Sequence, residues 1–108
     1  MIVRNWHGRV PAAKAAAYLD LMRDVAIPDY RKTPGNLGAW ALSRPDEEHG
    51  GEVVHIEMLT FWTSLDAIRA FAGDEVDKAK YYAFDADYLL EMEPTVRHYE
   101  AIGEAPKG

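Results

Sequence analysis

The chain has 108 residues and contains no cysteine. This absence excludes disulfide bonds, thiolate metal sites and a cysteine nucleophile. Several motifs of well-understood chemistry are also missing. No glycine-rich loop follows a strand in the dinucleotide or phosphate patterns, and neither HExxH nor GxSxG occurs. Proteins whose chemistry depends on those motifs are therefore not expected.

Long apolar runs and basic clusters are missing too. No segment approaches the ~18 apolar residues of a membrane-spanning helix. Residues 1–7 contain no apolar run followed by a cleavage site, which predicts a cytoplasmic protein. Twelve Lys and Arg face eighteen Asp and Glu, for a formal net charge of −6, and the basic residues do not cluster. We therefore expect neither nucleic acid nor membrane as a partner.

The segment 52–62 is apolar on both faces, because side chains alternate along a strand. One face carries Val53, His55, Glu57, Leu59 and Phe61, and the other carries Val54, Ile56, Met58, Thr60 and Trp62. A chain of this length has about two helices, which can cover one side of a small sheet. The second apolar face then needs a partner, and a second copy of the chain is the simplest one. The pattern predicts a homodimer that forms through the sheet faces.

The remaining elements follow from periodicity and from turn signals. In chain order we expect a strand at 2–7 closed by Gly8, a helix at 12–26 that Pro28 ends or turns, and strands at 37–43 and 52–62. A second helix is expected at 65–72, where a Thr63/Asp66 capping box begins it and Gly73 stops it. A short helix at 75–82, a turn at 87–92 and a strand at 95–102 complete the chain. Asp46, Glu47 and Glu48 are expected to face solvent in a polar hairpin loop at 45–51.

This β-α-β-β-α-β order predicts an α+β, ferredoxin-like fold, with a four-stranded antiparallel sheet and both helices on one face. The length fits one domain. We place that domain at residues 1–102 and expect a flexible C-terminal tail at 103–108.

Three stretches carry a resemblance to a known family. They are Thr33-Pro34-Gly35-Asn36-Leu37-Gly38, Leu59-Thr60-Phe61-Trp62-Thr63-Ser64 and Val96-Arg97-His98-Tyr99-Glu100. With the element order, they resemble the antibiotic biosynthesis monooxygenase family of the dimeric α/β-barrel superfamily, over about residues 2–102. The resemblance implies a dimeric α/β barrel that oxygenates an aromatic or polyketide-type small molecule without a cofactor. Haem binding or degradation, and non-catalytic binding of a small molecule, are the alternatives.

The haem-degrading branch of that family uses an Asn in the first strand, a Trp late in the second helix and a His one short helix later. Asn5 matches the first position, whereas Phe71 and Tyr81 stand at the second and third. Under this alternative haem would be the cofactor, and Tyr81 would ligate its iron as a phenolate.

Three polar residues are candidates for catalysis. Asn5 shares one face of its strand with Val3 and His7, and if that face lies under the helices it can hold a carbonyl or phenol by hydrogen bonds. The Tyr81 hydroxyl can donate to a bound oxyanion or exchange a proton with it. His98 titrates near neutrality and can act as a base; it lies on the opposite face of its strand from Tyr99.

Four further residues are predicted to line the substrate pocket: Trp62, Phe71, Tyr82 and His7. Trp62 is expected to point to the same pocket wall as Asn5. Ordinary core packing, or a hydroxyl in water, remains the alternative for each aromatic residue. His55 and Glu57 share a face and would form a metal site with another His, but no third ligand is evident, so no metal is predicted.

Oxygenation without a cofactor asks little of a protein. Triplet oxygen reacts slowly with closed-shell molecules, but an electron-rich phenolate or carbanion can give it one electron. The protein then needs a dry pocket, a proton acceptor, and hydrogen bonds that stabilise the anion. The residue types of Asn5, Trp62, Tyr81 and His98 suit these tasks.

Overall fold

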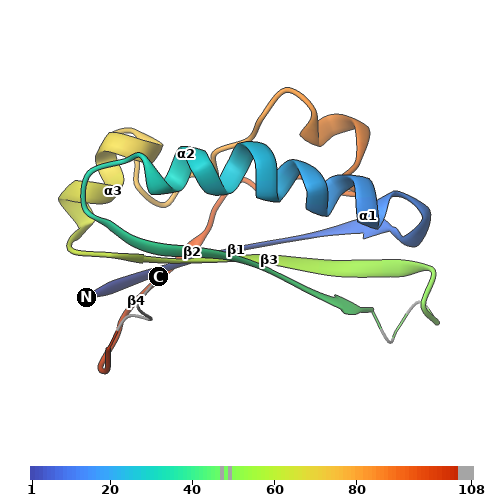
Figure 1. Cartoon of the computed structure of the whole chain (residues 1–108), viewed down its shortest axis with the longest axis horizontal. Coiled ribbons are helices and arrows are strands. Elements are labelled where there is room, and N and C mark those ends of the chain that lie inside the picture. Colours follow the sequence, from blue (N-terminus) through green and yellow to red (C-terminus); the bar gives the residue numbers. More distant parts are fainter. Residues whose placement is uncertain (47, 49, 105–108) are drawn as a thin grey trace.

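A computed structural model describes residues 1–46, 48 and 50–104 of the chain. One antiparallel sheet of four strands has its helices on one side (Figure 1). The strands are β1 (Ile2–Pro11), β2 (Asn36–Pro45), β3 (Val53–Trp62) and β4 (Arg97–Glu100), in the order β2-β3-β1-β4. The helical elements are α1 (Ala12–Leu21), the π-helical η1 (Met22–Ala26), α2 (Ile27–Arg31), α3 (Leu65–Ala72) and the 3₁₀ turn η3 (Asp85–Asp87). This α+β arrangement is compatible with the predicted ferredoxin-like fold.

The first strand is longer than predicted, because Gly8 does not close it. β1 continues to Pro11 and pairs with β3 over its whole length. Gly8 lies on the same face as Trp6, and a Cβ atom at Gly8 would lie 2.7 Å from the indole ring. The missing side chain therefore lets the Trp6 ring lie across the strand.

The first helix passes through Pro28, so the prediction that this proline ends or turns it was wrong. The ring of a proline in a helix clashes with the carbonyl four residues earlier, here that of Asp24. Asp24 lies within η1, the π-helical turn that directly precedes α2. A wider turn of this kind changes the local hydrogen-bond spacing, which accommodates the proline. Asp29 and Tyr30 consequently remain helical.

The second half of the chain differs in two details. The cap of α3 is Ser64, whose Oγ accepts from the N–H of Ala67 at 3.1 Å, so the capping box begun by Thr63 was wrong. Gly73 ends this helix with φ of 91°, as predicted. The helix expected at 75–82 does not form. Residues 73–96, which we call the α3–β4 connection, are irregular apart from η3 and a bridge between Lys78 and Thr95.

The two faces of the sheet have different surroundings, which confirms the alternation predicted for β3. Ile56, Met58, Thr60 and Trp62 are buried under the helices, whereas His55, Glu57, Leu59 and Phe61 are only half-buried. No described helix covers the second face, which we call the open face (Figure 1). Only its end near the hairpin is reached by the α3–β4 connection, where Glu91 bonds to Arg9 and Glu93 lies beside His7. Away from the buried Val53 at the start of β3, the apolar residues of the open face are Val3, Trp40, Leu42, Leu59, Phe61 and Tyr99.

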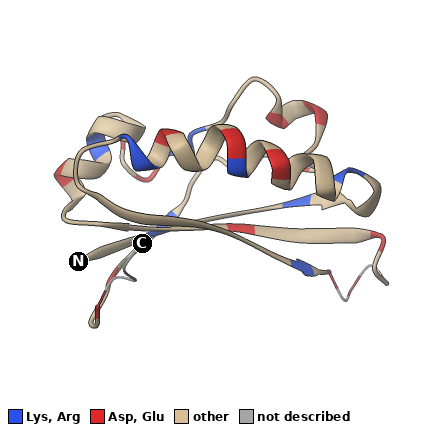
Figure 2. Cartoon of the chain, in the orientation of Figure 1, with Lys and Arg blue, Asp and Glu red and all other residues tan. Residues whose placement is uncertain are grey.

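Charged residues are spread along the helical layer, while the strands carry few (Figure 2). Asp46, which was predicted to face solvent in the hairpin loop, is instead buried, so this prediction was wrong. Its carboxylate lies 3.5 Å from a guanidinium nitrogen of Arg9. Glu48 of the same loop is exposed, and Glu47 lies outside the described residues. Of the predicted tail, residues 103 and 104 are exposed, and 105–108 lie outside the described part. Among the helices that are described, none has the length and apolarity of a membrane span.

Candidate functional site

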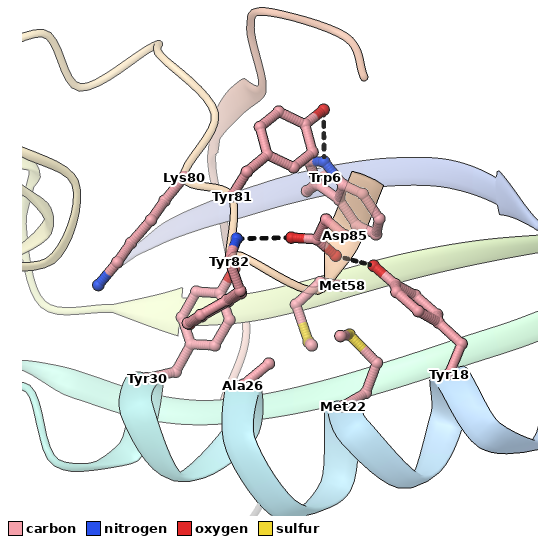
Figure 3. A pocket seen from close by; sticks show the side chains of 10 residues that line it. All are labelled: Trp6, Tyr18, Met22, Ala26, Tyr30, Met58, Lys80, Tyr81, Tyr82 and Asp85. Atoms are coloured by element: carbon pink, nitrogen blue, oxygen red, sulfur yellow. Dashed lines mark hydrogen bonds between the residues drawn. The ribbon is translucent and has the colours of Figure 1, made fainter. Parts of the chain in front are cut away.

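A small pocket lies between the covered face of the sheet and the helical layer (Figure 3). Its walls come from β1, β3, the helix α1–η1–α2 and the α3–β4 connection. The lining residues are Trp6, Tyr18, Met22, Ala26, Tyr30, Met58, Lys80, Tyr81, Tyr82 and Asp85. Aromatic rings and two thioethers therefore surround one carboxyl group and one amine.

Asp85 is the buried carboxyl of this pocket and is only 2% exposed. The Tyr18 hydroxyl donates to Oδ1 at 2.8 Å, and the backbone N–H of Tyr82 donates to Oδ2 at 2.6 Å (Figure 3). Burial raises the pKa of Asp85, while these two hydrogen bonds oppose the rise. A carboxylate in this position can accept a proton from a molecule in the pocket.

Tyr18 is the fixed donor of this pair. Its hydroxyl has a pKa raised well above the usual range, first by burial and then by the neighbouring Asp85. The phenol therefore keeps its proton over the range in which Asp85 titrates. Tyr18 holds the carboxylate in one orientation and leaves proton exchange to Asp85.

Tyr81 lines this pocket, but its hydroxyl already both accepts and donates a hydrogen bond. The hydroxyl accepts from Nε1 of Trp6 at 3.3 Å and donates to the carbonyl of Glu93 at 2.6 Å. Its pKa is raised, first by burial. To donate to a ligand, or to bind iron as a phenolate, Tyr81 must first leave the Glu93 carbonyl.

Tyr82 and Lys80 separate the pocket from an outer groove. Oδ2 of Asp29 accepts from the Tyr82 hydroxyl at 2.7 Å and from Lys80 Nζ at 2.8 Å. Although burial opposes it, these bonds hold the pKa of Asp29 below its usual range. The volume of the pocket that is open to the centre of a water molecule is about 10 Å³, so the pocket holds about one water. The outer groove has a corresponding volume of about 460 Å³, and Lys80 and Tyr82 line it too.

Asn5 and His7 lie on the open face, away from this pocket. The Asn5 amide donates to Glu57 Oε1 at 3.4 Å, and His7 Nε2 lies 3.2 Å from a carboxylate oxygen of Glu93. The face that they share is therefore not under the helices, and the prediction that Asn5 and Trp62 share one pocket wall was wrong. Trp6, their neighbour on the other face of β1, lines the pocket instead.

Trp62 and Phe71 belong to the core behind the pocket and are not among its lining residues. Trp62 is fully buried, and its indole N–H donates to Thr60 Oγ1 at 2.8 Å. Phe71 stacks on Tyr30 with ring centroids 4.2 Å apart. The two residues support the position of Tyr30, which does line the pocket.

His98 also lies outside the pocket, on the opposite face of β4 from Tyr99, as predicted. Its Nε2 is 3.1 Å from Nη1 of Arg4, and its Nδ1 is 2.9 Å from Oδ1 of Asp77. Both ring nitrogens are thus engaged with charged neighbours, so His98 is not placed to act as the base for a ligand in this pocket.

The possible metal site gains a histidine in the structure but no converging ligands. His7 stacks on His55 with ring centroids 5.7 Å apart, and His55 Nε2 lies 3.8 Å from Glu57. Within the described ranges, no three His, Asp or Glu side chains are arranged to hold a metal ion.

Three central residues were not among the sequence-based candidates: Trp6, Tyr18 and Asp85. Two acidic residues, Asp85 and Asp87, lie between Phe84 and Tyr88 in an aromatic-rich segment. The sequence does not tell which of the two carboxyls is buried, and only the structure shows that Asp85 is buried while Asp87 is exposed. Tyr18 lies within the helix predicted at 12–26, and nothing in the sequence marked it as a residue of the site.

The chain was also compared with known proteins. No protein-family model matches it, and neither a curated protein nor a solved structure matches it.

Proposed function

We propose that the chain is a cofactor-independent oxygenase of a small, electron-rich aromatic molecule, and that Asp85 is its general base. The observation that carries this proposal is the buried carboxyl of Asp85, which faces a pocket of aromatic and methionine side chains. The preferred substrate is an aromatic C–H acid, in which a ring system activates a CH₂ group, as in an anthrone. Such a molecule can supply the electrons that oxygen needs.

The proposed reaction balances without a cofactor. Asp85 takes one proton from the activated CH₂ group and leaves a carbanion that is delocalised over the rings. The carbanion gives one electron to O₂, and the two radicals combine to form a C–O bond. The resulting peroxide takes the proton back from Asp85, and loss of water leaves a carbonyl group. In sum CH₂ and O₂ become C=O and H₂O, so that the substrate gives the four electrons that O₂ accepts.

The pocket supports this reaction in three ways. Tyr18 and the N–H of Tyr82 hold the Asp85 carboxylate in one orientation. Burial raises the pKa of Asp85 and so strengthens it as a base for a weak acid. The apolar walls keep water away from the carbanion, which protects it from simple reprotonation.

Substrate entry requires a movement of Lys80 and Tyr82. The closed pocket has room for about one water, so an aromatic ring system cannot enter while both side chains are bound to Asp29. Their release would join the pocket to the outer groove. The groove lies against η1 and α2, and we propose that it is the entrance.

We further propose that the protein acts as a homodimer, with a second copy covering the open face. The middle of this face is apolar, and Trp40 lies against Phe61 with ring centroids 5.4 Å apart. Its end carries charged and ionisable groups, among them His7, Arg9 and Arg44. An apolar centre with a polar rim is the usual composition of a protein–protein interface.

The test is oxygen uptake by the purified protein with a panel of anthrones and phenols, without added flavin, haem or metal. We expect saturable uptake and a carbonyl product. Asp85→Asn should lower kcat at least about a hundredfold, the usual contribution of a general base. Asp87→Asn is the matched control, because this exposed carboxylate belongs to the same 3₁₀ turn.

Two results would contradict the proposal. Equal rates in Asp85→Asn and the wild-type protein would exclude Asp85 as the base. Ligand-induced stabilisation without any oxygen uptake would indicate a binding protein instead. Haem should produce no saturable Soret shift, and such a shift followed by decay with a reductant would favour haem degradation.

A further inference from the structure

Arg4 is a buried cation next to the pocket and ties β1 to the α3–β4 connection. Its side chain lies on the same face of β1 as Trp6, and the residue is 2% exposed. Nη1 donates to the carbonyl of Val76 at 2.5 Å, and Nη2 donates to that of Lys78 at 3.0 Å. The Lys80–Tyr82 segment, which lines the pocket, begins two residues after Lys78. Arg4 therefore anchors the backbone from which those side chains extend.

The third partner of Arg4 fixes the protonation state of His98. Arginine has only N–H donors, so His98 Nε2, 3.1 Å from Nη1, has to accept and carries no proton. The proton of a neutral imidazole then lies on Nδ1, which donates to Asp77 Oδ1 at 2.9 Å. A protonated His98 would direct an N–H of a charged ring at the N–H of a buried guanidinium. This geometry thus permits only neutral His98 in a single tautomer.

We infer that Arg4 and His98 are positioning residues of the pocket wall and that protonation of His98 releases this wall. The inference rests on the proposed function only in treating the pocket as the active site. The ionisable groups that face His98 are Arg4 on β1 and Asp77 on the connection, while Tyr30 of α2 interacts with Arg4 in turn.

Burial and Arg4 disfavour the imidazolium, whereas Asp77 favours it. Burial is the largest influence, and the pKa of His98 is lowered overall. The release is therefore expected on the acidic side of an ordinary histidine titration. Asp77 is largely exposed, so it cannot offset the repulsion between imidazolium and guanidinium in full.

Release of Arg4 should loosen a defined set of backbone bonds. Val96 donates to the carbonyl of Asp77 at 2.8 Å, and Ala79 donates to that of Pro94 at 2.9 Å. These bonds join two parts of the connection, residues 77–79 and the residues just before β4, on either side of the Lys78 carbonyl that Arg4 binds. Tyr81 follows directly, and its hydroxyl is the acceptor of the Trp6 indole N–H.

The test is an NMR pH titration that needs no substrate. It follows the ring nitrogens of His98, the indole N–H of Trp6, and the hydrogen-exchange protection of the Val96 and Ala79 amides. At neutral pH, His98 of the wild-type protein should be in the Nδ1–H tautomer. The indole signal should shift with the same midpoint as His98. Protection of the two amides should fall about tenfold below that midpoint, the equivalent of losing one charge-assisted hydrogen bond.

Three substitutions separate this role from general structural support. In His98→Gln the amide oxygen replaces Nε2 as the acceptor for Arg4 and does not titrate, so protection should stay high across the range. His98→Asn is too short to reach Arg4, and protection should be low at every pH. Asp77→Asn still accepts from Nδ1–H but cannot stabilise the imidazolium, so the midpoint should move to lower pH.

Three observations would overturn the inference. They are the Nε2–H tautomer in neutral protein, a pH transition of the wall that persists in His98→Gln, and high protection in His98→Asn. Because none of these readouts involves turnover, a failure to detect oxygenase activity would contradict the proposed function alone.

Discussion

The two faces of the sheet are built from alternate residues of the same strands, yet they have opposite surroundings. On the covered face Trp62 is fully buried, whereas its neighbour Phe61 is half-buried on the open face. The covered face also holds the polar groups that are costly to bury, Arg4 and Thr60. Each of these groups is hydrogen-bonded across the sheet or to the α3–β4 connection. The polarity of the residues alone therefore does not tell which face of a strand is inside.

Truncation of one aromatic residue on each face should show the largest difference between the two faces. Trp62→Ala should lower the free energy of unfolding by about 3–5 kcal/mol, because it leaves a large cavity in the core. Phe61→Ala should cost about 1 kcal/mol within the protomer, since that side chain is only partly buried there. Urea denaturation at low protein concentration measures both. Equal losses would contradict the assignment of inside and outside.

A charge placed on the open face tests whether a second copy covers it. Leu59→Arg should raise the dissociation constant of the dimer at least about a hundredfold, or about 2.7 kcal/mol, because the interface would bury an unpaired charge. Leu65→Arg is the matched control, since Leu65 is an exposed leucine on α3. Sedimentation velocity across a concentration series measures the effect. A wild-type protein that is monomeric at micromolar concentration would exclude the dimer.

The next prediction concerns the hydrogen bond that orients the buried carboxyl. Tyr18→Phe removes the donor to Asp85 Oδ1 and should cost about 2 kcal/mol, because a buried carboxyl loses one of its two hydrogen bonds. The pKa of Asp85 should rise further, because one of the two bonds that oppose the effect of burial is lost. Urea denaturation and carboxyl NMR of the variant measure the two effects. An unchanged Asp85 titration would show that Tyr18 does not hold its proton toward this carboxylate.

The smallest expected change in the free energy of unfolding is a gain in stability, and it concerns Asp85 itself. Burial raises the folded-state pKa of Asp85, so the wild-type protein loses stability as the pH rises from the unfolded pKa through the folded one. Asp85→Asn removes this penalty; its amide oxygen can accept from Tyr82, and its NH₂ can donate to Tyr18. The variant should be about 1 kcal/mol more stable at pH 7 and little different below about pH 4. Denaturation at both pH values measures this, and a less stable variant at pH 7 would indicate a structural carboxylate.

The sequence predicted the order of the elements and both faces of β3 because the alternation there is regular. The faces of β1 were harder to assign. Arg4 makes the face that bears Trp6 look polar, and Val3 makes the opposite face look apolar. A charged residue that is buried on backbone carbonyls breaks the simple pattern. Asn5 was consequently considered for a pocket that it does not reach.

The α3–β4 connection limited the prediction of the site. Asp85, Tyr81 and Tyr82 lie in a segment without helical or strand periodicity, so the sequence contains no signal for where their side chains point. Tyr81 and Tyr82 were found by residue type alone. Asp85 was missed, because its importance depends on burial by residues that are distant in sequence, such as Tyr18.

The most direct test of the account compares two pH dependences in the same protein. One is kcat/KM for oxygen uptake with the best substrate of the panel, and the other is the titration of the Asp85 carboxyl followed by ¹³C NMR. If Asp85 is the base, the rate should fall on the acidic side with the midpoint of that titration. A rate that stays constant while Asp85 becomes protonated would contradict its role and, with it, the proposed function of the pocket.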